Sequence, residues 1–310
     1  MDKVIVTPRS LSSGGHPLLN KIRDAGYELV FPSPGAQPSE AELEAVIADA
    51  IGYLAGVEHI GSHLIEAASR LRVISRNGTG VDNIDLEAAG RKGIVIRRAE
   101  GANARGVAEL AFGLILDSAR SISKVDSALK SGLWTREKGF ELEGKTLGLI
   151  GCGKVGRLVA RFALAFEMRV LAYDPYPDAG FDPGPGFAWA PFARVLSDAG
   201  VLSLHCPPRK GGKPVLGAEE IAALRKGVVV VNTARQSLVD EAALAFALDT
   251  GAVRAYAIDA FDREPPADFA FLKRTSVLAT SHIGGFTEES IERATEVAID
   301  NLLAALREAA

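Results

Sequence analysis

The chain has 310 residues, 47% of them hydrophobic and 24% charged, which is the composition of an ordinary soluble globular protein. Its length exceeds what one hydrophobic core usually supports, and this favours two domains. The 39 acidic residues against 35 lysines and arginines give a net charge of −4, which leaves no electrostatic case for binding nucleic acid or an acidic membrane. We therefore expect neither kind of partner.

The start of the chain lacks the long apolar core of a signal peptide, so we expect no leader.

Strand-like and helical segments alternate along the first hundred residues. Residues 39–50 and 62–70 have helical periodicity. Short β-branched runs predict five strands, at residues 4–8, 27–31, 52–56, 72–76 and 93–97. This alternation predicts a parallel sheet with helices on both faces.

A second series of the same kind follows. The apolar spacing predicts one long helix over residues 102–131. Its most apolar stretch, 107–116, is too short to span a bilayer and contains Glu109. Six further apolar runs predict a second parallel sheet, at residues 145–153, 168–175, 200–208, 227–235, 253–261 and 275–282. A last helix begins near Glu288, and the pattern does not say on which domain it packs.

A glycine-rich turn lies between the first strand of the second series and a helix. Gly151, Gly153 and Gly156 form a GxGxxG motif in this position. In such a turn the first glycine allows the bend, the second admits a pyrophosphate and the third lets helix pack on strand. The next predicted strand ends at Asp174, whose carboxylate suits the two ribose hydroxyls of NAD and disfavours the extra phosphate of NADP. We predict an NAD site, with NADP as the alternative.

Polar side chains follow four strands of the second series, where ligands bind in an open α/β sheet. These are His205, Arg235, Asp259 and His282, and Glu264 lies between the last two. Hydride transfer needs an acid–base group, and a histidine beside a carboxylate supplies one. An arginine can hold a substrate carboxylate through two bonds. We predict that Arg235, Glu264 and His282 are catalytic.

The two cysteines, Cys152 and Cys206, lack the spacing of metal ligands. We expect reduced thiols, a cytoplasmic protein and no metal ion.

The order of these motifs resembles that of the D-isomer-specific 2-hydroxyacid dehydrogenases. The motifs are GxGxxG, YDP, HCP, NTAR, the EP of residues 264–265 and HIGG, together with SRNGTGVDNIDLEAA and GANARGVAELAFGLIL in the first part of the chain. The resemblance covers roughly residues 50–290. It implies two Rossmann-like or flavodoxin-like domains with an active-site cleft between them. Residues 1–98 with 286–310 would form the substrate domain and residues 99–285 the NAD-binding domain, which usually carries the contact of a homodimer.

The resemblance also implies the role of each site residue. Glu264 would pair with His282, which protonates the carbonyl oxygen, while Arg235 holds the substrate. The substrate pocket would also use the first-domain loop, at Asn77, Gly78, Thr79 and Gly80. The remaining cofactor contacts would be Lys154 and Val155 at the pyrophosphate, His205, Cys206 and Pro207 at the adenosine, and Thr233, Ala234, Asp259, Gly284 and Gly285 near the nicotinamide.

Two positions near the predicted site depart from the family pattern. Gln236 stands where the family usually has glycine, and Ser281 where it usually has proline. A glycine at position 236 would have permitted a positive φ, so for glutamine we predict an ordinary negative φ.

The substrate is less well defined than the cofactor. A D-3-phosphoglycerate dehydrogenase-like activity is the leading hypothesis, and a glyoxylate or hydroxypyruvate reductase is the alternative. Glu58 and His59 lie where a phosphate-binding arginine would be expected, and an acid there would disfavour a phosphorylated substrate. We expect no C-terminal regulatory domain. A remote alternative of another class is a scaffold that senses NAD(H) without turnover.

Overall fold

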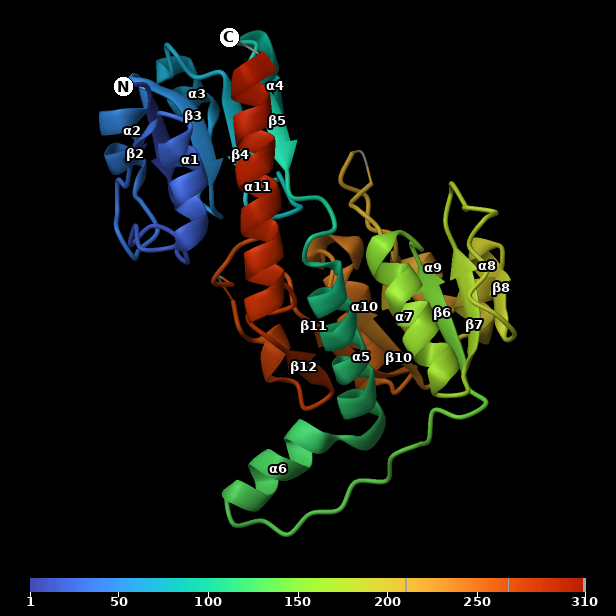
Figure 1. Ribbon diagram of the computed structural model, residues 1–310. Coiled ribbons are helices and arrows are strands. Elements are labelled where there is room, and N and C mark those ends of the chain that lie inside the picture. The colour runs from blue at the N-terminus through green and yellow to red at the C-terminus, as the bar shows by residue number, and fades with distance from the viewer. Residues whose placement is uncertain (210, 267, 309–310) are drawn as a thin grey trace. The chain divides into compact units, whose positions relative to one another are not determined.

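The computed structural model describes residues 1–209, 211–266 and 268–308 (Figure 1). The chain divides into two compact units, one of residues 1–103 with 287–310 and the other of residues 104–286. Within the described ranges, no helix is both long enough and apolar enough to cross a membrane.

The first unit is built on a five-stranded parallel sheet of order β2-β1-β3-β4-β5. Its strands are β1 (Lys3–Val6), β2 (Glu28–Val30), β3 (Ala50–Ala55), β4 (Val73–Arg76) and β5 (Val95–Arg98). All five were predicted from the β-branched runs. The strand order reverses between β1 and β3, which is the flavodoxin-like arrangement.

Helices cover both faces of this sheet. On one face lie η1 (Pro17–Leu19), α1 (Asn20–Asp24) and the long α11 (Glu288–Glu308), shown in red in Figure 1. The helix α11 packs on β3, β4 and β5, and the hydroxyl of Ser75 donates to the carbonyl of Ala298 at 2.7 Å. On the other face lie α2 (Glu40–Ile47), α3 (Ser62–Ala67) and α4 (Leu86–Arg91). Each face therefore has its own apolar core.

The second unit contains a seven-stranded parallel sheet of order β12-β11-β10-β9-β6-β7-β8. Its strands are β6 (Thr146–Ile150), β7 (Arg169–Tyr173), β8 (Phe187–Trp189), β9 (Val201–Leu204), β10 (Val228–Asn232), β11 (Val253–Ile258) and β12 (Val277–Ala279). Six were predicted. The seventh, β8, was not predicted: its apolar run, Phe187–Trp189, has only three residues, and none of them is fully buried.

Except for α6, the helices of the second unit pack on both faces of its sheet. The helices of this unit are α5 (Ala104–Arg120), α6 (Ile122–Lys130), α7 (Lys154–Ala165), α8 (Phe192–Asp198), α9 (Ala218–Ala222) and α10 (Glu241–Asp249), with the short turns η2 (Gln236–Leu238) and η3 (Phe271–Lys273). The valines of β10 join both cores, because Val229 and Val231 face α5 and α7 while Val228 and Val230 face the opposite side.

The single long helix predicted over residues 102–131 is wrong. The structure has two helices there, α5 and α6, separated at Ser121. Ser121 has φ of 55°, in the left-handed region, and this turns the chain between the two helices. The apolar spacing continues through α6 at Ile122, Val125 and Leu129, although α6 has no buried residue.

Candidate active site

Most of the predicted site residues of the second unit follow one row of the seven-stranded sheet. Strand pairing aligns the last residue of each strand with its neighbour, in the order Tyr173, Ile150, Leu204, Asn232, Ile258 and Ala279. The next residue of each strand begins a site segment: Asp174, Gly151, His205, Thr233, Asp259 and Thr280. The predicted groups therefore meet at the carboxyl edge of the sheet, and the strand order reverses between β6 and β9.

The three glycines of the GxGxxG turn have different physical reasons. Gly151 has φ of 91°, and a Cβ there would lie 2.6 Å from the backbone carbon of His205. A Cβ on Gly156 would lie 2.4 Å from the carbonyl oxygen of Gly151. Packing within the protein thus explains both positions. A Cβ on Gly153 would meet no atom within 4 Å, so the protein itself does not require glycine there.

Gly153 is the N-cap of α7, and no side chain caps this helix. The amides of a helix start attract phosphate groups, and open space at Gly153 lets such a group reach them. The site therefore fits the pyrophosphate of a dinucleotide, next to Lys154 and Val155.

Asp174 is held at the edge of this turn by two backbone groups. Its Oδ2 accepts from the amide of Cys152 at 2.9 Å, and its Oδ1 accepts from the amide of Tyr176 at 2.9 Å. The carboxylate is partly exposed, and each oxygen can accept a further bond. The nearby Arg157 is paired with Asp178 at 2.8 Å. The free acceptor positions of Asp174 suit ribose hydroxyls, and its contact with the ribose stays a prediction.

The turn that carries Arg235 is organised by Asn232, the last residue of β10. The buried Asn232 donates through Nδ2 to the carbonyl of Arg235 at 2.7 Å and to the hydroxyl of Tyr256 at 3.1 Å. Its Oδ1 accepts from the amide of Ala234 at 3.1 Å. Asn232 therefore fixes the backbone from Thr233 to Arg235. The sequence interpretation did not identify Asn232 as a site residue, although a polar residue at the end of a valine run indicates a side chain with hydrogen bonds to make.

The hydroxyl of Thr233 in the same turn is buried and has no hydrogen-bond partner among the residues that the structure describes. An unsatisfied buried hydroxyl is costly. A ligand at this edge of the sheet would satisfy it.

His282 and Glu264 form the predicted pair. The Nδ1 of His282 lies 2.7 and 2.9 Å from the two carboxylate oxygens of Glu264. Glu264 also accepts from the amide of Phe261 at 3.0 Å, which orients the carboxylate. Because Nδ1 of His282 faces the carboxylate, the N–H at Nδ1 donates a hydrogen bond to Glu264. The other ring nitrogen, Nε2, is left to exchange a proton with another group.

The backbone places His282 in an uncommon conformation. Its φ is 56°, in the left-handed region that non-glycine residues seldom adopt. Asp259, which is 1% exposed, anchors the surrounding segment. Its Oδ1 accepts from the hydroxyl of Thr280 at 2.7 Å and from the amide of Ile283 at 2.8 Å, and its Oδ2 accepts from the amide of Gly284 at 2.9 Å. Asp259 thus positions the loop of His282; its predicted contact with the cofactor stays a prediction. Thr280 was not identified from the sequence.

The second histidine of this edge has a different character. The Nε2 of His205 lies 2.9 Å from the hydroxyl of Ser203, and burial lowers the pKa of His205 to about 4. It is therefore neutral near pH 7 and unsuited to hold a catalytic proton. Burial likewise raises the pKa of Cys206 to about 11 and that of Cys152 to about 12, so both free thiols stay protonated.

The predicted substrate loop of the first unit follows β4. The Nη1 of Arg76 donates to the carbonyl of Asn77 at 2.7 Å and would lie 2.9 Å from a Cβ on Gly78, so a guanidinium covers this glycine. The hydroxyl of Thr79 lies 3.3 Å from Oδ1 of Asn103. Gly80 completes the segment.

Glu58 has a different environment from the one that the sequence interpretation assumed. It is buried, and its Oε1 accepts from the hydroxyl of Tyr53 at 2.8 Å, from the amide of Gly56 at 2.9 Å and from the hydroxyl of Thr7. Its carboxylate is thus bound inside the first unit. The objection to a phosphorylated substrate, which rested on a carboxylate facing the ligand, loses its basis.

The glycine turn, the carboxylate of Asp174 and the histidine–carboxylate pair at one sheet edge define a dinucleotide-binding protein of the dehydrogenase class. A sequence model of the D-isomer specific 2-hydroxyacid dehydrogenase NAD-binding domain matches residues 112–284. The chain belongs to this family, and its seven-stranded unit is an NAD-binding domain.

Individual relatives agree with this assignment. The chain is 41% identical over 247 residues to a D-3-phosphoglycerate dehydrogenase of Methanocaldococcus jannaschii, covering 79% of this chain and 47% of the relative. It is 41% identical over 239 residues to a hydroxypyruvate reductase of Thermotoga maritima, covering 76% of this chain and 77% of the relative. The solved structure of the TT0316 protein from Thermus thermophilus has a TM-score of 0.86 at 33% identity, covering 99% of this chain and 97% of that one. The chain spans about half the length of the phosphoglycerate dehydrogenases that it matches.

Proposed function

We propose that the protein is an NAD-dependent dehydrogenase that interconverts a small D-2-hydroxy acid and the corresponding 2-oxo acid. The observation that carries the proposal is the His282–Glu264 pair, at 2.7 Å, on the same sheet edge as Arg235 and the dinucleotide turn. NAD, when bound, accepts or supplies the hydride. The chain supplies the proton chemistry and the charge that binds a carboxylate.

Each catalytic residue has one task in this proposal. The Nε2 of His282 gives a proton to the carbonyl oxygen during reduction and takes one from the hydroxyl during oxidation. Glu264 holds the ring through Nδ1, which leaves Nε2 for the substrate. Arg235 binds the substrate carboxylate, and its charge also polarises the carbonyl oxygen. Asn77, Gly78, Thr79 and Gly80 of the first unit also bind the substrate in this proposal.

The cofactor contacts are proposed residue by residue. Gly153, Lys154 and Val155 bind the pyrophosphate through the start of α7, and Asp174 binds the adenosine ribose. His205, Cys206 and Pro207 contact the adenosine. Thr233, Ala234, Asp259, Gly284 and Gly285 lie toward the nicotinamide, where the Thr233 hydroxyl gains the partner that it lacks among the described residues.

A phosphoglycerate-type substrate is the leading proposal for this site. Arg76 places a guanidinium over Gly78, beside the predicted carboxylate loop, and Glu58 is bound internally. A second arginine of the same sheet, Arg97 of β5, is paired with Glu308 at 3.3 Å. A cation next to the carboxylate loop favours a substrate with a second anionic group. The alternative, a glyoxylate or hydroxypyruvate reductase, is favoured by the likeness to the Thermotoga reductase.

A panel of 2-oxo acids with NADH or NADPH tests the proposal. It should contain phosphohydroxypyruvate, hydroxypyruvate, glyoxylate, pyruvate and 2-oxoglutarate. We expect oxidation of NADH with at least one of them and a preference for NADH over NADPH. Arg235→Gln and His282→Gln should lose turnover while retaining NADH binding. NADH binding without turnover on any acid would instead support the scaffold alternative.

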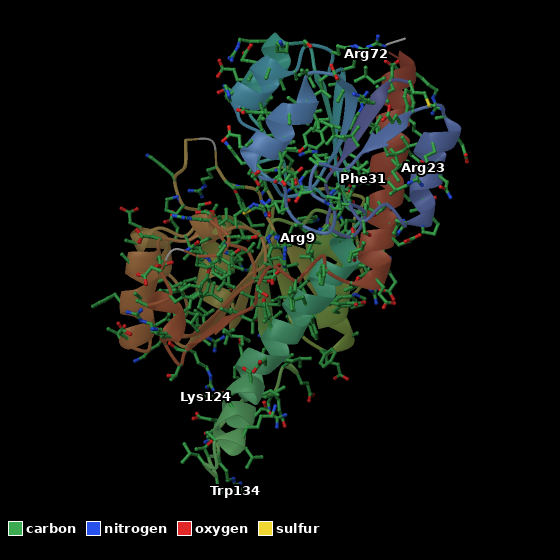
Figure 2. The ribbon with its side chains drawn as sticks, turned by 90° about the vertical axis from the view of Figure 1, so that its left-hand side faces the viewer. Arg9, Arg23, Phe31, Arg72, Lys124 and Trp134 are labelled. Atoms are coloured by element: carbon green, nitrogen blue, oxygen red, sulfur yellow. The ribbon has the colours of Figure 1, made fainter. Side chains whose placement is uncertain are left out.

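We also propose that the protein forms a homodimer through α6 and the segment 131–139. In Figures 1 and 2 these residues extend away from the rest of the second unit, with Trp134 at the far end. The apolar side chains of this arm are exposed: Ile122, Leu129, Leu133 and Trp134, the last at 84%. An ion pair of 2.8 Å between Lys124 and Glu137 ties the helix to the segment. A second copy would cover this apolar surface.

Sedimentation of wild type and of Leu133→Ser/Trp134→Ser tests the homodimer. The variant should be monomeric at concentrations where wild type is dimeric. The control is Phe246→Ser, which removes a side chain of similar exposure on α10 and should leave the dimer intact. A variant that stays dimeric would place the contact elsewhere.

A cytoplasmic location is proposed on the same basis as the reduced thiols. Cys152 and Cys206 are both free. Proteins with free, protonated thiols are typical of a reducing compartment.

A further inference from the structure

A solvent-open cavity lies at the edge of the seven-stranded sheet opposite to the dinucleotide turn. Its volume is about 510 Å³. Thr146, Arg169 and Phe187 line it, and they are the first residues of β6, β7 and β8. The NAD site instead follows the last residues of the strands. The cavity is therefore separate from the proposed chemistry, and none of its lining residues has a role there.

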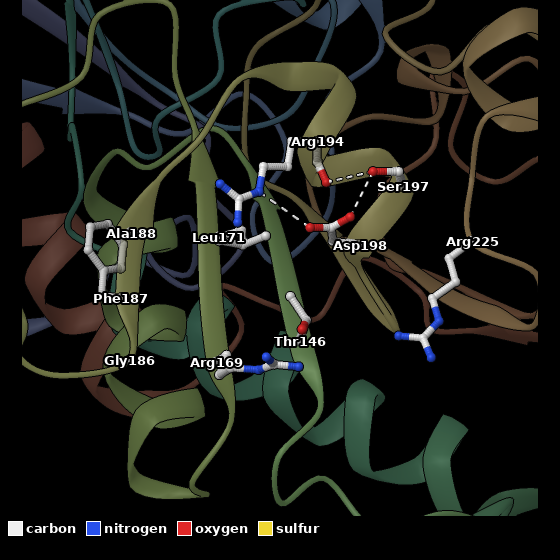
Figure 3. Close-up of a pocket in the computed structure, with 10 residues that line it drawn as sticks. All are labelled: Thr146, Arg169, Leu171, Gly186, Phe187, Ala188, Arg194, Ser197, Asp198 and Arg225. Carbon is white, nitrogen blue, oxygen red and sulfur yellow. Dashed lines mark hydrogen bonds and ion pairs between the residues drawn. The ribbon is translucent and has the colours of Figure 1, made fainter.

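The charges around this cavity are unbalanced. Three arginines line it, Arg169 from β7, Arg194 from α8 and Arg225 from the segment before β10, as Figure 3 shows. Among the described lining residues the only acid is Asp198, which lies 3.4 Å from Arg194. A hydrogen bond from Ser197, together with Arg194 and Arg169, lowers the pKa of Asp198, so it carries its charge near pH 7. The lining retains two more positive than negative charges.

Two polar groups of the lining have no partner in the part of the chain that the structure describes. The guanidinium of Arg225 makes no hydrogen bond or ion pair there, and neither does the hydroxyl of Thr146. Thr146 is only 5% exposed, yet its hydroxyl points toward the guanidinium of Arg169 in Figure 3. The guanidinium of Arg225 is exposed and Thr146 lines the cavity, so both groups can bind a ligand that enters it.

We propose that this cavity binds a small molecule through a phosphate group, at a site distinct from the NAD site. A guanidinium matches two oxygens of a phosphate at once, and a threonine hydroxyl donates to a third. A monovalent anion would leave one of the excess charges uncompensated. The cavity is larger than one phosphate group, so the phosphate of a larger metabolite can enter with part of its carrier against Leu171 and Ala188.

Titration calorimetry on the intact chain tests this site, with inorganic pyrophosphate and inorganic phosphate as the probes. Saturating NADH fills the dinucleotide site beforehand, and sodium chloride keeps the ionic strength constant because exposed charges are screened by salt. The variants are Arg169→Gln and Arg225→Gln, both exposed, and Thr146→Val, which keeps the shape and removes the hydroxyl. Arg136→Gln, an exposed arginine after α6, is the matched control.

We expect pyrophosphate to bind more tightly than phosphate. Each arginine variant should weaken binding by about tenfold or more, since each loses a charge-assisted hydrogen bond. Thr146→Val should weaken it less, and Arg136→Gln should not weaken it. NADH affinity should be unchanged in all four, which shows that the unit is folded and that the dinucleotide turn is intact.

The proposal is overturned if wild type saturated with NADH binds neither probe. It is also overturned if the two arginine variants bind the probes as tightly as wild type, or if Arg136→Gln weakens binding as much as the two arginine variants do. Tighter binding of citrate than of pyrophosphate would refute the phosphate assignment. The measurement does not depend on turnover, so it stands whether or not the dehydrogenase proposal is right.

Discussion

The glycines of the dinucleotide turn allow the NAD site to be tested apart from stability. Gly151→Ala adds a Cβ at φ of 91° and 2.6 Å from the backbone of His205. The left-handed conformation costs alanine about 1–2 kcal/mol. The overlap with a neighbouring strand, whose backbone cannot rotate away, costs about 1–3 kcal/mol more. We expect a loss of about 3 kcal/mol in the free energy of unfolding.

Gly153→Ala, two residues on, should behave differently. Its Cβ meets no atom within 4 Å and its φ is −78°, a conformation open to alanine. Alanine is a poorer N-cap than glycine, so the stability cost should be about 1 kcal/mol, well below that of Gly151→Ala. The same Cβ occupies the space through which a pyrophosphate reaches the start of α7. NADH should therefore bind about tenfold more weakly, or worse.

Thermal melting and NADH fluorescence titration separate the two effects. For a unit of this size, about 3 kcal/mol corresponds to a melting temperature lower by about 6–12 °C. We expect this drop for Gly151→Ala and only a small one for Gly153→Ala, whose defect should appear in NADH affinity. If Gly153→Ala bound NADH as wild type does, the ligand would not approach this glycine. If Gly151→Ala melted with wild type, the packing explanation would fail.

Three further predictions concern residues around this edge. The pKa of His205 is lowered from 6.5 to about 4, so the contribution of neutral His205 to the free energy of unfolding is present above pH 6.5 and is lost as the pH falls toward 4. Between pH 7.5 and 5, urea unfolding should show wild type losing about 2 kcal/mol more than His205→Gln. Asp259→Asn puts an NH₂ group where an oxygen accepts hydrogen bonds, and should cost about 2–3 kcal/mol in the same assay and reduce kcat; unchanged values would refute its role as the anchor of the loop. Gln236→Ala should lower kcat without changing NADH affinity, and Gln236→Glu should not restore it, because a carboxylate would face Glu241.

The location of the site could be predicted from sequence because parallel strands end at a common edge. The apolar runs fix where β6, β9, β10 and β11 end, and register then brings His205, Thr233 and Asp259 together without any knowledge of side-chain contacts. What the pattern could not supply is which polar group serves the ligand and which holds the loop. In the sequence, an aspartate at position 259 could either bind the ligand or hold the loop. Only its three hydrogen bonds within the protein show that it holds the loop.

The local backbone conformation was a second feature that could not be predicted from the sequence. Ser121 breaks the expected long helix through a left-handed φ, and serine is neither a strong helix breaker nor a residue typical of that region. Nothing in the apolar spacing marks the break, because Ile122, Val125 and Leu129 continue the helical spacing through α6. Glu58 illustrates the same limit for charge. Its position in the sequence suggested a carboxylate facing the substrate, whereas the backbone turns it inward to Thr7, Tyr53 and Gly56.

Gln236 shows how a departure from the family pattern can be accommodated by a side chain. Its φ is not positive, as predicted, and it begins η2 directly after Arg235. Its Nε2 donates to Glu241 at 2.8 Å, and its Oε1 accepts from the amide of Asp262 at 3.4 Å. Asp262 lies two residues before Glu264. The glutamine thus links the turn that carries the proposed substrate-binding arginine to the loop that carries the carboxylate partner of His282, a connection that a glycine, having no side chain, could not make.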